Sequence, residues 1–583
     1  MGAAAPAESD AVQEYDADEA DDVCTPLQST FPGGKPVLNI AAVPAASDQG
    51  AQPPMSTRRR IASSIASLFT PRTARTARNE LGRATLPKVI QALKEMRPDE
   101  EIADAGRRLL ELCPNHDKVS RATNQGALEA IAAALKMYFE KPEVVVWLLP
   151  PLINLSSGDD TAGFNRAATL VSHGVLELVC TVLRAHVAAA AETADPTDVE
   201  MRSQIVERCV WAMQHLCRRD HSLSADGSSE YQSEARQAAC KQWHARLAAV
   251  GAVPAVCDAM VAWPVRTKVQ LHGCNLLGTY VSGRYAGEAP DADEPPEVLA
   301  CVNVVTATLG AAVSSFGPDA PVLGAAIHAI SDVACTPGLA RRAVAGGAIT
   351  HVADAMESKP QSAPLQEGCC WAVHQLCKGT DRETREKVGG SAAPRAIVHA
   401  LKGLDIRGAG NLATMREKAC RALDALVEDS AGADERELTL TLVMKDQLSR
   451  LEVFKAVVAA LKAHRKVVPL IVHACDLLAA LCSGNDPYDE RKNMASASGV
   501  IPAIVNILKK NLKNAEVQDA GRRALIVICY NPELQSVALQ SGANPDWSPR
   551  GLKPATPGPE SNRGTLPRDA AGADEPEGIT QTV

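Results

Sequence analysis

Apolar side chains recur at helical spacing along most of the chain. Segments that open with a glycine and an apolar run, such as GALEAIAAALK, begin at Gly126, Gly174, Gly251, Gly347 and Gly499. Each is followed by a second apolar stripe that starts on a small residue and ends seven residues later on a large aliphatic one. Apolar positions three and four residues apart predict amphipathic α-helices and no sheet.

The helical pattern repeats. The closing aliphatic positions are Leu112, Leu155, Leu216, Val281, Val333, Leu376, Leu426, Leu481 and Ile528. Gly126, Gly251, Gly347 and Gly499 precede their closing positions by 29 or 30 residues. In four units, 14 residues lead from a closing position to the next glycine, which makes a basic unit of 43 residues. Longer spacings come from insertions near 188–200, 218–235 and 284–297. A period of about 40 to 47 residues built from two or three helices is typical of a helical solenoid.

Physical chemistry explains why such a unit must repeat. One helix pair cannot bury its own apolar stripe, whereas stacked neighbours bury it. The opening glycine supplies backbone freedom where a short helix stops and the chain turns. Small residues at the start of the closing helices allow close helix approach, and we expect most cysteines to serve this packing role.

The closing segments ERCVWAMQHLC, EGCCWAVHQLC and HACDLLAALC resemble those of the armadillo-repeat family. The resemblance implies a right-handed α-solenoid of about nine repeats over residues 84–543. It also implies a non-catalytic scaffold or adaptor that holds partner proteins or extended peptides in a concave groove. Pro150 and Pro151 depart from the pattern and predict a kink or interruption in the helix ending at Leu155.

The resemblance places the groove along the last helix of each repeat. Residues two and six positions after each small starter lie four apart and share one helix face. The predicted partner-binding residues in these two columns are Arg107, Asn154, Trp211, His215, Tyr280, His328, Asp332, Trp371, Gln375, Arg421 and Arg523. Another interpretation of Trp211 and Trp371 is that they pack beneath a neighbouring insertion.

Other classes of function have weaker support. A nuclear-transport adaptor for basic peptides would carry paired Trp and Asn in these columns, and no repeat has both. Cys370, His374 and Cys377 have the spacing of metal ligands on one helix face, without an evident fourth ligand. Residues 408–413 match a dinucleotide fingerprint but follow no strand. We therefore expect no enzyme, no cofactor and no bound metal.

The amino-acid composition further limits the class of protein and its compartment. The 583 residues are 46% hydrophobic and 22% charged, as in a folded globular chain. The longest apolar run, 144–155, has 12 residues and contains two prolines, whereas a membrane-spanning helix needs about 20. The first 30 residues lack the features of a signal or transit peptide. We expect a cytoplasmic protein with reduced thiols among its 17 cysteines, with a nuclear or peripheral membrane pool left open.

Charge separates the N-terminal region into two segments. Residues 1–55 hold nine acidic residues and one lysine, and residues 56–83 hold seven arginines and one acid. Composition predicts disorder for 1–55 and for the Pro/Gly-rich segment 544–583. A basic amphipathic stretch at 58–69 could pack on the next domain, contact a membrane surface or dock on a partner helix. Ser63 is a candidate phosphorylation site there. We expect protein or peptide partners and no nucleic acid, and the oligomeric state stays open.

Overall fold

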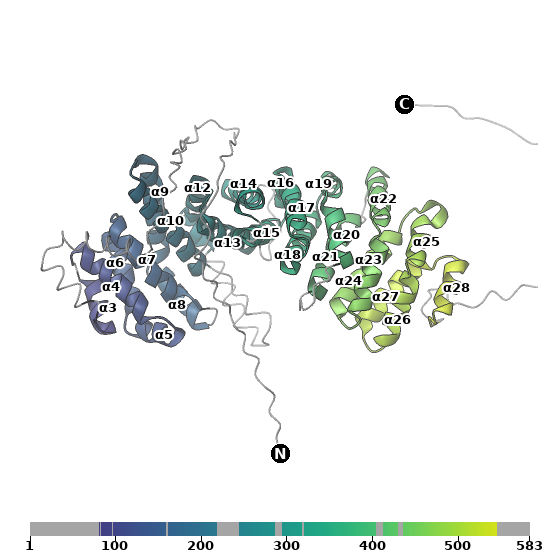
Figure 1. The fold of residues 1–583 in the computed structure, drawn as a ribbon, viewed down its shortest axis with the longest axis horizontal. Coiled ribbons are helices and arrows are strands. Elements are labelled where there is room, and N and C mark those ends of the chain that lie inside the picture. The colour runs from purple at the N-terminus through teal and green to yellow at the C-terminus, as the bar shows by residue number, and fades with distance from the viewer. Residues whose placement is uncertain are drawn as a thin grey trace, which may run out of the picture. The chain divides into compact units, whose positions relative to one another are not determined.

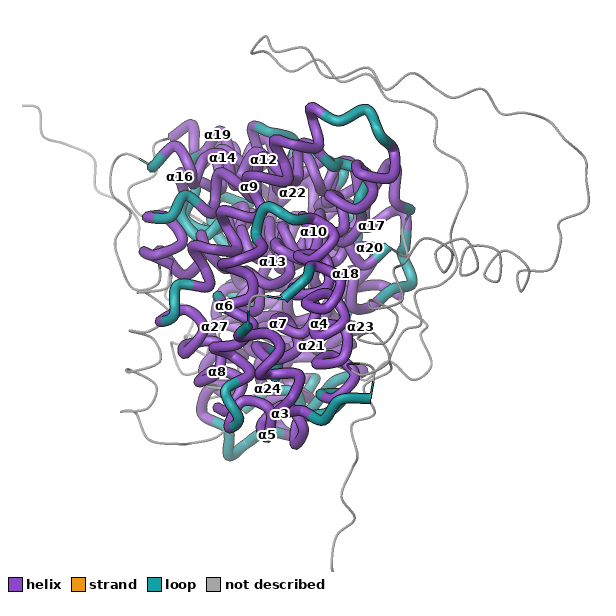
Figure 2. The backbone as a smooth tube through the Cα atoms, turned by 90° about the vertical axis from the view of Figure 1, so that its left-hand side faces the viewer, coloured by secondary structure: helices purple, strands orange, loops and turns teal. Residues whose placement is uncertain are grey.

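The computed structural model describes residues 81, 83–95, 97–158, 161–217, 244–285, 294–317, 320–403, 412–428 and 435–544. Within these ranges every regular element is a helix and none is a strand (Figure 2), which confirms the predicted all-α class. The predicted tail 1–55, the stretch 58–69 with Ser63, and residues 545–583 lie outside the described ranges. The chain divides into two compact units, Met1–Ala329 and Ile330–Val583, called unit 1 and unit 2 below.

In the described ranges unit 1 has twelve helical elements, and eight of them form two packed rows. The twelve elements are α3 (Leu86–Lys94), α4 (Asp99–Leu112), α5 (His116–Asn124), α6 (Ala127–Tyr138), α7 (Pro142–Ser156), α8 (Thr161–Ser172), α9 (Val175–Glu192), α10 (Pro196–Leu216), α12 (Ala252–Ala262), α13 (Thr267–Arg284), α14 (Pro296–Ala311) and the π-helix η2 (Ala312–Phe316). In the first row α4, α7, α10 and α13 pack in that order, and in the second row α3, α6, α9 and α12 do the same (Figure 1). Helix α15 (Pro321–Val333) crosses the division between the units.

Unit 2 has the same internal order with a third row added. Its helices are α16 (Pro337–Ala345), α17 (Ala348–Ser358), α18 (Ala363–Cys377), α19 (Arg382–Gly389), α20 (Ala393–Gly403), α21 (Leu412–Val427), α22 (Glu435–Arg450), α23 (Val453–Ala463), α24 (Val468–Cys482), the 3-10 helix η3 (Pro487–Asp489), α25 (Glu490–Ala497), α26 (Val500–Lys510), α27 (Ala515–Ile528) and α28 (Pro532–Gln540). Helices α18, α21, α24 and α27 form one row, and α17, α20, α23 and α26 form the next. Helices α16, α19, α22 and α25 form the third row. A three-helix motif therefore recurs within the unit.

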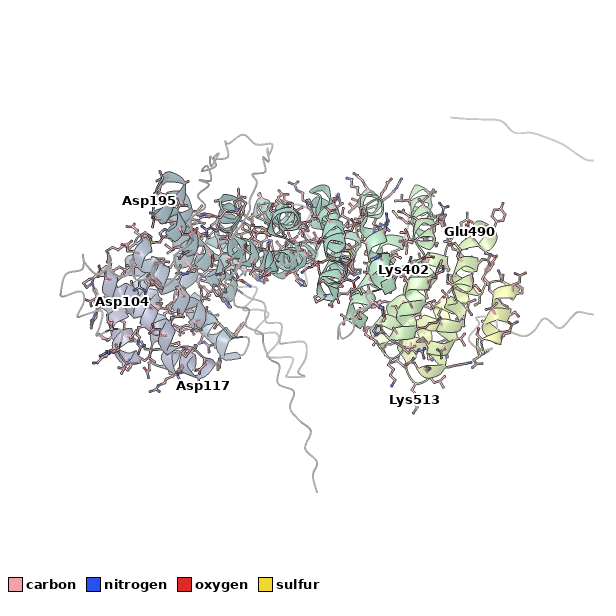
Figure 3. The ribbon with its side chains drawn as sticks, viewed as in Figure 1. Asp104, Asp117, Asp195, Lys402, Glu490 and Lys513 are labelled. Carbon is pink, nitrogen blue, oxygen red and sulfur yellow. The ribbon has the colours of Figure 1, made fainter. Side chains whose placement is uncertain are left out.

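Left-handed backbone turns start the middle helix of most motifs. The predicted opening glycines all have positive φ at the N-cap of a helix, from 63° to 94°: Gly126, Gly174, Gly251, Gly347 and Gly499. The equivalent position before α23 is Glu452, at φ 65°. Its carboxylate pairs with Lys402, 2.7 Å away (labelled in Figure 3), and with Lys455. Two ion pairs thus accompany a backbone conformation that a side chain normally avoids.

The closing helices end close to their predicted positions. Helices α4, α10, α15 and α27 end at the predicted residue, and the other five end within three residues of it. The insertion near 188–200 forms no separate loop, because α9 continues to Glu192 and α10 begins at Pro196. The extra residues therefore lengthen two helices. The insertion at 218–235 and most of that at 284–297 lie outside the described ranges.

The two prolines do not interrupt α7, so of the predicted kink or interruption the interruption is wrong. Helix α7 continues through Pro150 and Pro151 to Ser156. A proline has no N–H to donate to the carbonyl four residues earlier, which here leaves the carbonyls of Val146 and Trp147 without helical partners. Arg208 of α10 donates to the Val146 oxygen instead.

The Trp147 carbonyl meets the neighbouring helix at a glycine. A methyl group on Gly106 of α4 would lie 2.5 Å from the Trp147 oxygen, a distance that real contacts do not reach. Because Gly106 has no side chain, α4 can approach the Trp147 carbonyl this closely. Helices α4 and α10 thus accommodate the two prolines from opposite sides of α7.

The cysteines pack as expected. Of the cysteines in the described ranges, Cys335 is exposed, Cys529 is half-buried and the others are buried with free thiols. Burial raises the pKa of Cys370 and Cys377 to about 12, so these thiols stay protonated. This confirms a packing role for the buried set.

Among the residues that the structure describes, one unbroken helical stretch, Pro296–Phe316, is long and apolar enough to span a bilayer by length and composition. It packs against α12 and α13, and 44% of its apolar window is buried within the protein. A core helix passes the same test, so this stretch is weak evidence for a membrane span.

Candidate functional site

The first row of each unit carries the predicted site residues except His328 and Asp332, which lie on α15. A third column lies one position before the small starter residue of each closing helix. It shares the helix face of the two predicted columns, because it precedes them by three and seven residues. In this third column lie Trp147, Arg208, Lys418 and His473. All four are half-buried, as are the predicted residues Arg107, Trp211, Trp371 and Arg421.

In unit 1, Trp147 lies between two arginines. The Arg107 guanidinium is 4.0 Å from the centre of the Trp147 ring, and the Arg208 guanidinium is 6.0 Å from it. Arg107 also pairs with Asp104, and Arg208 donates to the Val146 carbonyl. Both cations are therefore already bound within the unit.

Trp211 is held in a second closed cluster. Its indole N–H donates to His215 Nε2 at 2.7 Å, so the structure brings together the two residues that the column pattern paired. The ring stacks on His272 with centroids 5.0 Å apart and planes 7° apart. His272 Nδ1 lies 2.7 Å from Gln214 Oε1. Burial, followed by nearby His215 and Lys268, lowers the pKa of His272 to about 4, so it is neutral at physiological pH.

The remaining predicted residues of the first half do not converge. Asn154 donates to the Cys113 carbonyl at 2.6 Å and so bridges α7 to the end of α4. Tyr280 is only 1% exposed, so its predicted contact with a partner is wrong: the ring is in the core, edge-on to His244. On α15, His328 is exposed and Asp332 is half-buried.

In unit 2, Trp371 supports Arg421. The Arg421 guanidinium lies 4.9 Å from the centre of the Trp371 ring, and Lys418 Nζ lies 5.8 Å from it. His374 stacks on the same indole, 5.1 Å between centroids, and its Nδ1 is 3.2 Å from the Arg421 carbonyl. Gln375 is half-buried beside this group, and Arg523 pairs with Asp476 at 2.8 Å.

A cleft of about 710 Å³ opens beside Arg421. It lies where α18, α21 and α24 meet the segment that leads from α18 into α19. Its lining is His374, Cys377, Lys378, Gly379, Thr380, Arg385, Arg421, Asp424, Ala425, Glu428 and His473. This volume is in the range of small-molecule and side-chain binding pockets.

Burial changes the charge state of three groups in the cleft. It lowers the pKa of His374 to about 4 and also lowers that of His473, where Arg421 adds to the effect. It raises the pKa of Asp424 to about 7, with Asp476 and Glu428 raising it further and Lys445 opposing. Both imidazoles are therefore neutral near pH 7, and Asp424 is partly protonated.

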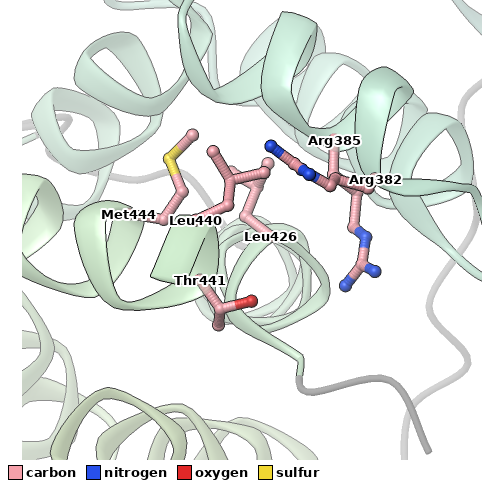
Figure 4. A pocket seen from close by; sticks show the side chains of 6 residues that line it. All are labelled: Arg382, Arg385, Leu426, Leu440, Thr441 and Met444. Carbon is pink, nitrogen blue, oxygen red and sulfur yellow. The ribbon is translucent and has the colours of Figure 1, made fainter. Parts of the chain in front are cut away.

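A small cavity lies behind this cleft, between α19, α21 and α22 (Figure 4). Its volume is about 10 Å³, enough for about one water molecule. Arg382, Arg385, Leu426, Leu440, Thr441 and Met444 line it. Arg385 thus lines both spaces, and it also donates to the Glu428 carbonyl at 2.7 Å, which holds its guanidinium at the end of α21.

Trp147, Asp424 and His473 were not predicted from the sequence pattern. The third column could have been found by extending the face by one turn towards the N-terminus, since its members are three residues before the first predicted column. Asp424 had no comparable signal, because its protonation depends on burial and on residues of α22 and α24.

Neither alternative chemistry gains support. In the described ranges no group of three or more His, Cys, Asp or Glu side chains is placed to hold a metal ion, and this includes Cys370, His374 and Cys377. Residues 408–411 of the dinucleotide-like segment lie outside those ranges.

Comparison with known proteins identifies no family. No family model matches the chain. No curated protein matches it. Among solved structures, two engineered proteins from the Northeast Structural Genomics Consortium are similar to parts of it. The first has 17% identity and a TM-score of 0.33, covering 41% of this chain and 87% of its own. The second has 15% identity and a TM-score of 0.37, covering 48% and 96%. Scores this low carry no argument about architecture or function.

Proposed function

We propose that the protein is a non-catalytic scaffold of armadillo-type repeats that binds partner proteins or extended peptides along the first row of helices. The recurring three-helix motif, its glycine-initiated middle helices and its period support an α-solenoid of about nine repeats. Each repeat of such an array buries its apolar stripe against its neighbours and leaves one face for ligands.

The observation that carries the binding role is the cleft in unit 2. Arg421 is half-exposed there, held on the face of Trp371, and opens onto a space of about 710 Å³. Aromatic and arginine side chains at the centre of a recess are the usual hot spots of protein interfaces. A cytoplasmic scaffold that docks partners through this face fits these features.

A capture experiment tests the proposal. The full chain, a Trp371→Ala variant and an Arg395→Ala control are immobilised and exposed to native lysate. Arg395 is an exposed arginine on α20, outside the first row. We expect partners that bind the wild type and the control and are lost with Trp371→Ala, while circular dichroism shows equal helix content. Identical partners for all three proteins would remove this face from the binding function.

A further inference from the structure

The fixed charges of the unit 2 cleft favour an anion. Its basic side chains are Lys378, Arg385 and Arg421, and its acidic ones are Asp424 and Glu428. Arginine is charged at all physiological pH values. The two histidines are neutral, and Asp424 carries only part of its charge near pH 7. The cleft therefore has an excess of positive charge.

Arg421 is preorganised to hold a carboxylate. Its guanidinium rests on the Trp371 ring at 4.9 Å, and the ring of His374 packs on that same indole. The Arg421 carbonyl is tied to His374 Nδ1 at 3.2 Å. An arginine fixed on an aromatic plane loses little side-chain entropy when it binds a planar, bidentate partner.

Acidic side chains on the same helix row are mostly paired already. Glu367 accepts from Lys418 at 2.5 Å, and Asp476 accepts from Arg523 at 2.8 Å. Arg421 forms an ion pair with Glu417, one helical turn earlier, at 3.7 Å, a distance too long for a hydrogen bond. Arg421 thus keeps donors for an incoming ligand, whereas a basic peptide would find few acids without partners.

Asp424 places an acidic group inside the cleft that is charged only part of the time. The groups around it are Glu428 and Cys420 on its own helix, His374 and Lys378 at the end of α18, Arg385 on α19, Lys445 on α22, and His473 and Asp476 on α24. As the pH rises through 7, Asp424 gains a negative charge a few residues from Arg421. Its ionisation opposes binding of an anion in the same cleft.

We propose that this cleft receives a carboxylate side chain of an acidic peptide segment in a partner protein, with Arg421 as the main anion-binding group and Asp424 as a charge that weakens binding when ionised. Lys378 and Arg385 add positive charge around the same space. The acidic side chain of Glu428 in the cleft repels a doubly charged phosphate more strongly than a singly charged carboxylate. The inference rests on the proposed scaffold function and names the chemistry of its ligand.

Fluorescence anisotropy with the full chain tests this. The probe is a short fluorescein-labelled peptide of alternating Glu and Gly, and matched peptides carry Gln, Lys or phosphoserine in place of Glu. We expect the Glu peptide to bind and the Gln and Lys peptides not to bind. Arg421→Ala is expected to weaken binding by at least about tenfold, Arg421→Lys by less, and the exposed control Arg395→Ala not at all.

The pH dependence is the more specific readout. Between pH 6 and pH 8 the affinity of the wild type for the Glu peptide should fall a few-fold, because Asp424 ionises while the peptide carboxylates stay charged at both values. Asp424→Asn should bind equally at both. A wild-type affinity that is the same at pH 6 and 8, or a fall that survives in Asp424→Asn, would overturn the role of Asp424.

Other outcomes separate this inference from the proposed function. Tighter binding of the Lys, Gln or phosphoserine peptide than of the Glu peptide overturns the ligand class. Binding of the Glu peptide that appears only after removal of residues 1–55 assigns the cleft to the chain's own acidic segment instead of a partner. If no peptide binds but lysate partners are still lost with Trp371→Ala, the inference fails alone. If those partners are also insensitive to Trp371→Ala, the scaffold proposal fails as well.

Discussion

The tryptophans of the two units lie in contrasting surroundings. In unit 1, Trp147 lies between arginines that already have partners, and Trp211 is stacked on His272 and bonded to His215. In unit 2, Trp371 supports Arg421 at the edge of an open cleft. The first row of unit 1 thus uses tryptophan for internal packing, and the first row of unit 2 uses it to support an arginine beside an open cleft.

The largest expected effect separates these two roles. Trp211→Ala should destabilise α10 and α13 by about 3 kcal/mol, because it removes a stacked ring and a hydrogen bond. Trp371→Ala should cost less, about 1 kcal/mol, because its half-buried ring lies beside an open cleft and mainly supports the cations of Arg421 and Lys418. Hydrogen exchange on peptides from α10 and α18 measures both. Equal losses of stability for the two variants would contradict the proposed difference between Trp211 and Trp371.

A second test compares two close helix contacts. Gly106→Ala should destabilise unit 1 by about 2 kcal/mol, because the new methyl group meets the Trp147 carbonyl, which cannot move aside easily. Gly521→Ala places its methyl group 2.6 Å from a Leu508 methyl, a flexible side-chain end. The gain in helix propensity, about 1 kcal/mol, should offset most of that cost. Urea unfolding followed by circular dichroism compares them, and a larger loss for Gly521→Ala would contradict this view.

A third test uses the pH dependence of unit 2. Its raised pKa means that folded Asp424 keeps a proton that the unfolded chain has released above about pH 4. The stability contributed by Asp424 at low pH is therefore lost as the pH rises through about 7. Asp424→Asn should be more stable than the wild type at pH 8, by about 2 kcal/mol, and nearly equal to it at pH 4.

The measurement is local hydrogen exchange of α21 in both proteins at each pH. His374 acts in the opposite sense, because its lowered pKa removes stability as the pH falls from about 6.5 to 4. Comparing the two proteins at the same pH cancels this contribution. A stability difference that does not change between pH 4 and pH 8 would contradict the assignment.

The smallest expected effect concerns Glu452, a left-handed helix cap that is not glycine. Glu452→Gly should relieve about 1 kcal/mol of backbone strain and lose the exposed ion pairs to Lys402 and Lys455, which leaves a small net stabilisation. Gly499→Ala should do the reverse and destabilise the unit by about 1 kcal/mol. Thermal unfolding of both variants tests the pair, and stabilisation by Gly499→Ala would contradict it.

Much of the helical order could be predicted from local pattern. Glycine openings and aliphatic closing positions predicted the caps at Gly126 and Gly499 and the ends of α4 and α27, because capping and amphipathic spacing are short-range effects. The left-handed Glu452 could not be predicted, since its conformation is supported by Lys402, fifty residues earlier in the chain.

The site was harder to predict for a similar reason. Helical spacing paired Trp211 with His215 correctly, since both lie on one helix. The same spacing placed Tyr280 in the partner-binding groove, whereas Tyr280 is buried by neighbouring helices. The cleft depends on α18, α19, α21 and α24 meeting, and the charge of Asp424 depends on that meeting as well. Neither the cleft nor the charge state of Asp424 can therefore be predicted from one segment of the chain.

The two prolines of α7 tie together residues that are far apart in the chain. Arg208 caps the carbonyl that Pro150 frees, and Gly106 makes room for the one that Pro151 frees. Arg208 also lies 6.0 Å from the centre of the Trp147 ring, a contact that does not depend on Pro150. Loss of Arg208 should therefore cost more beside Pro150 than after Pro150 is replaced by a residue with an N–H group. The effect of a substitution at any one of these four positions therefore depends on which residues occupy the other three.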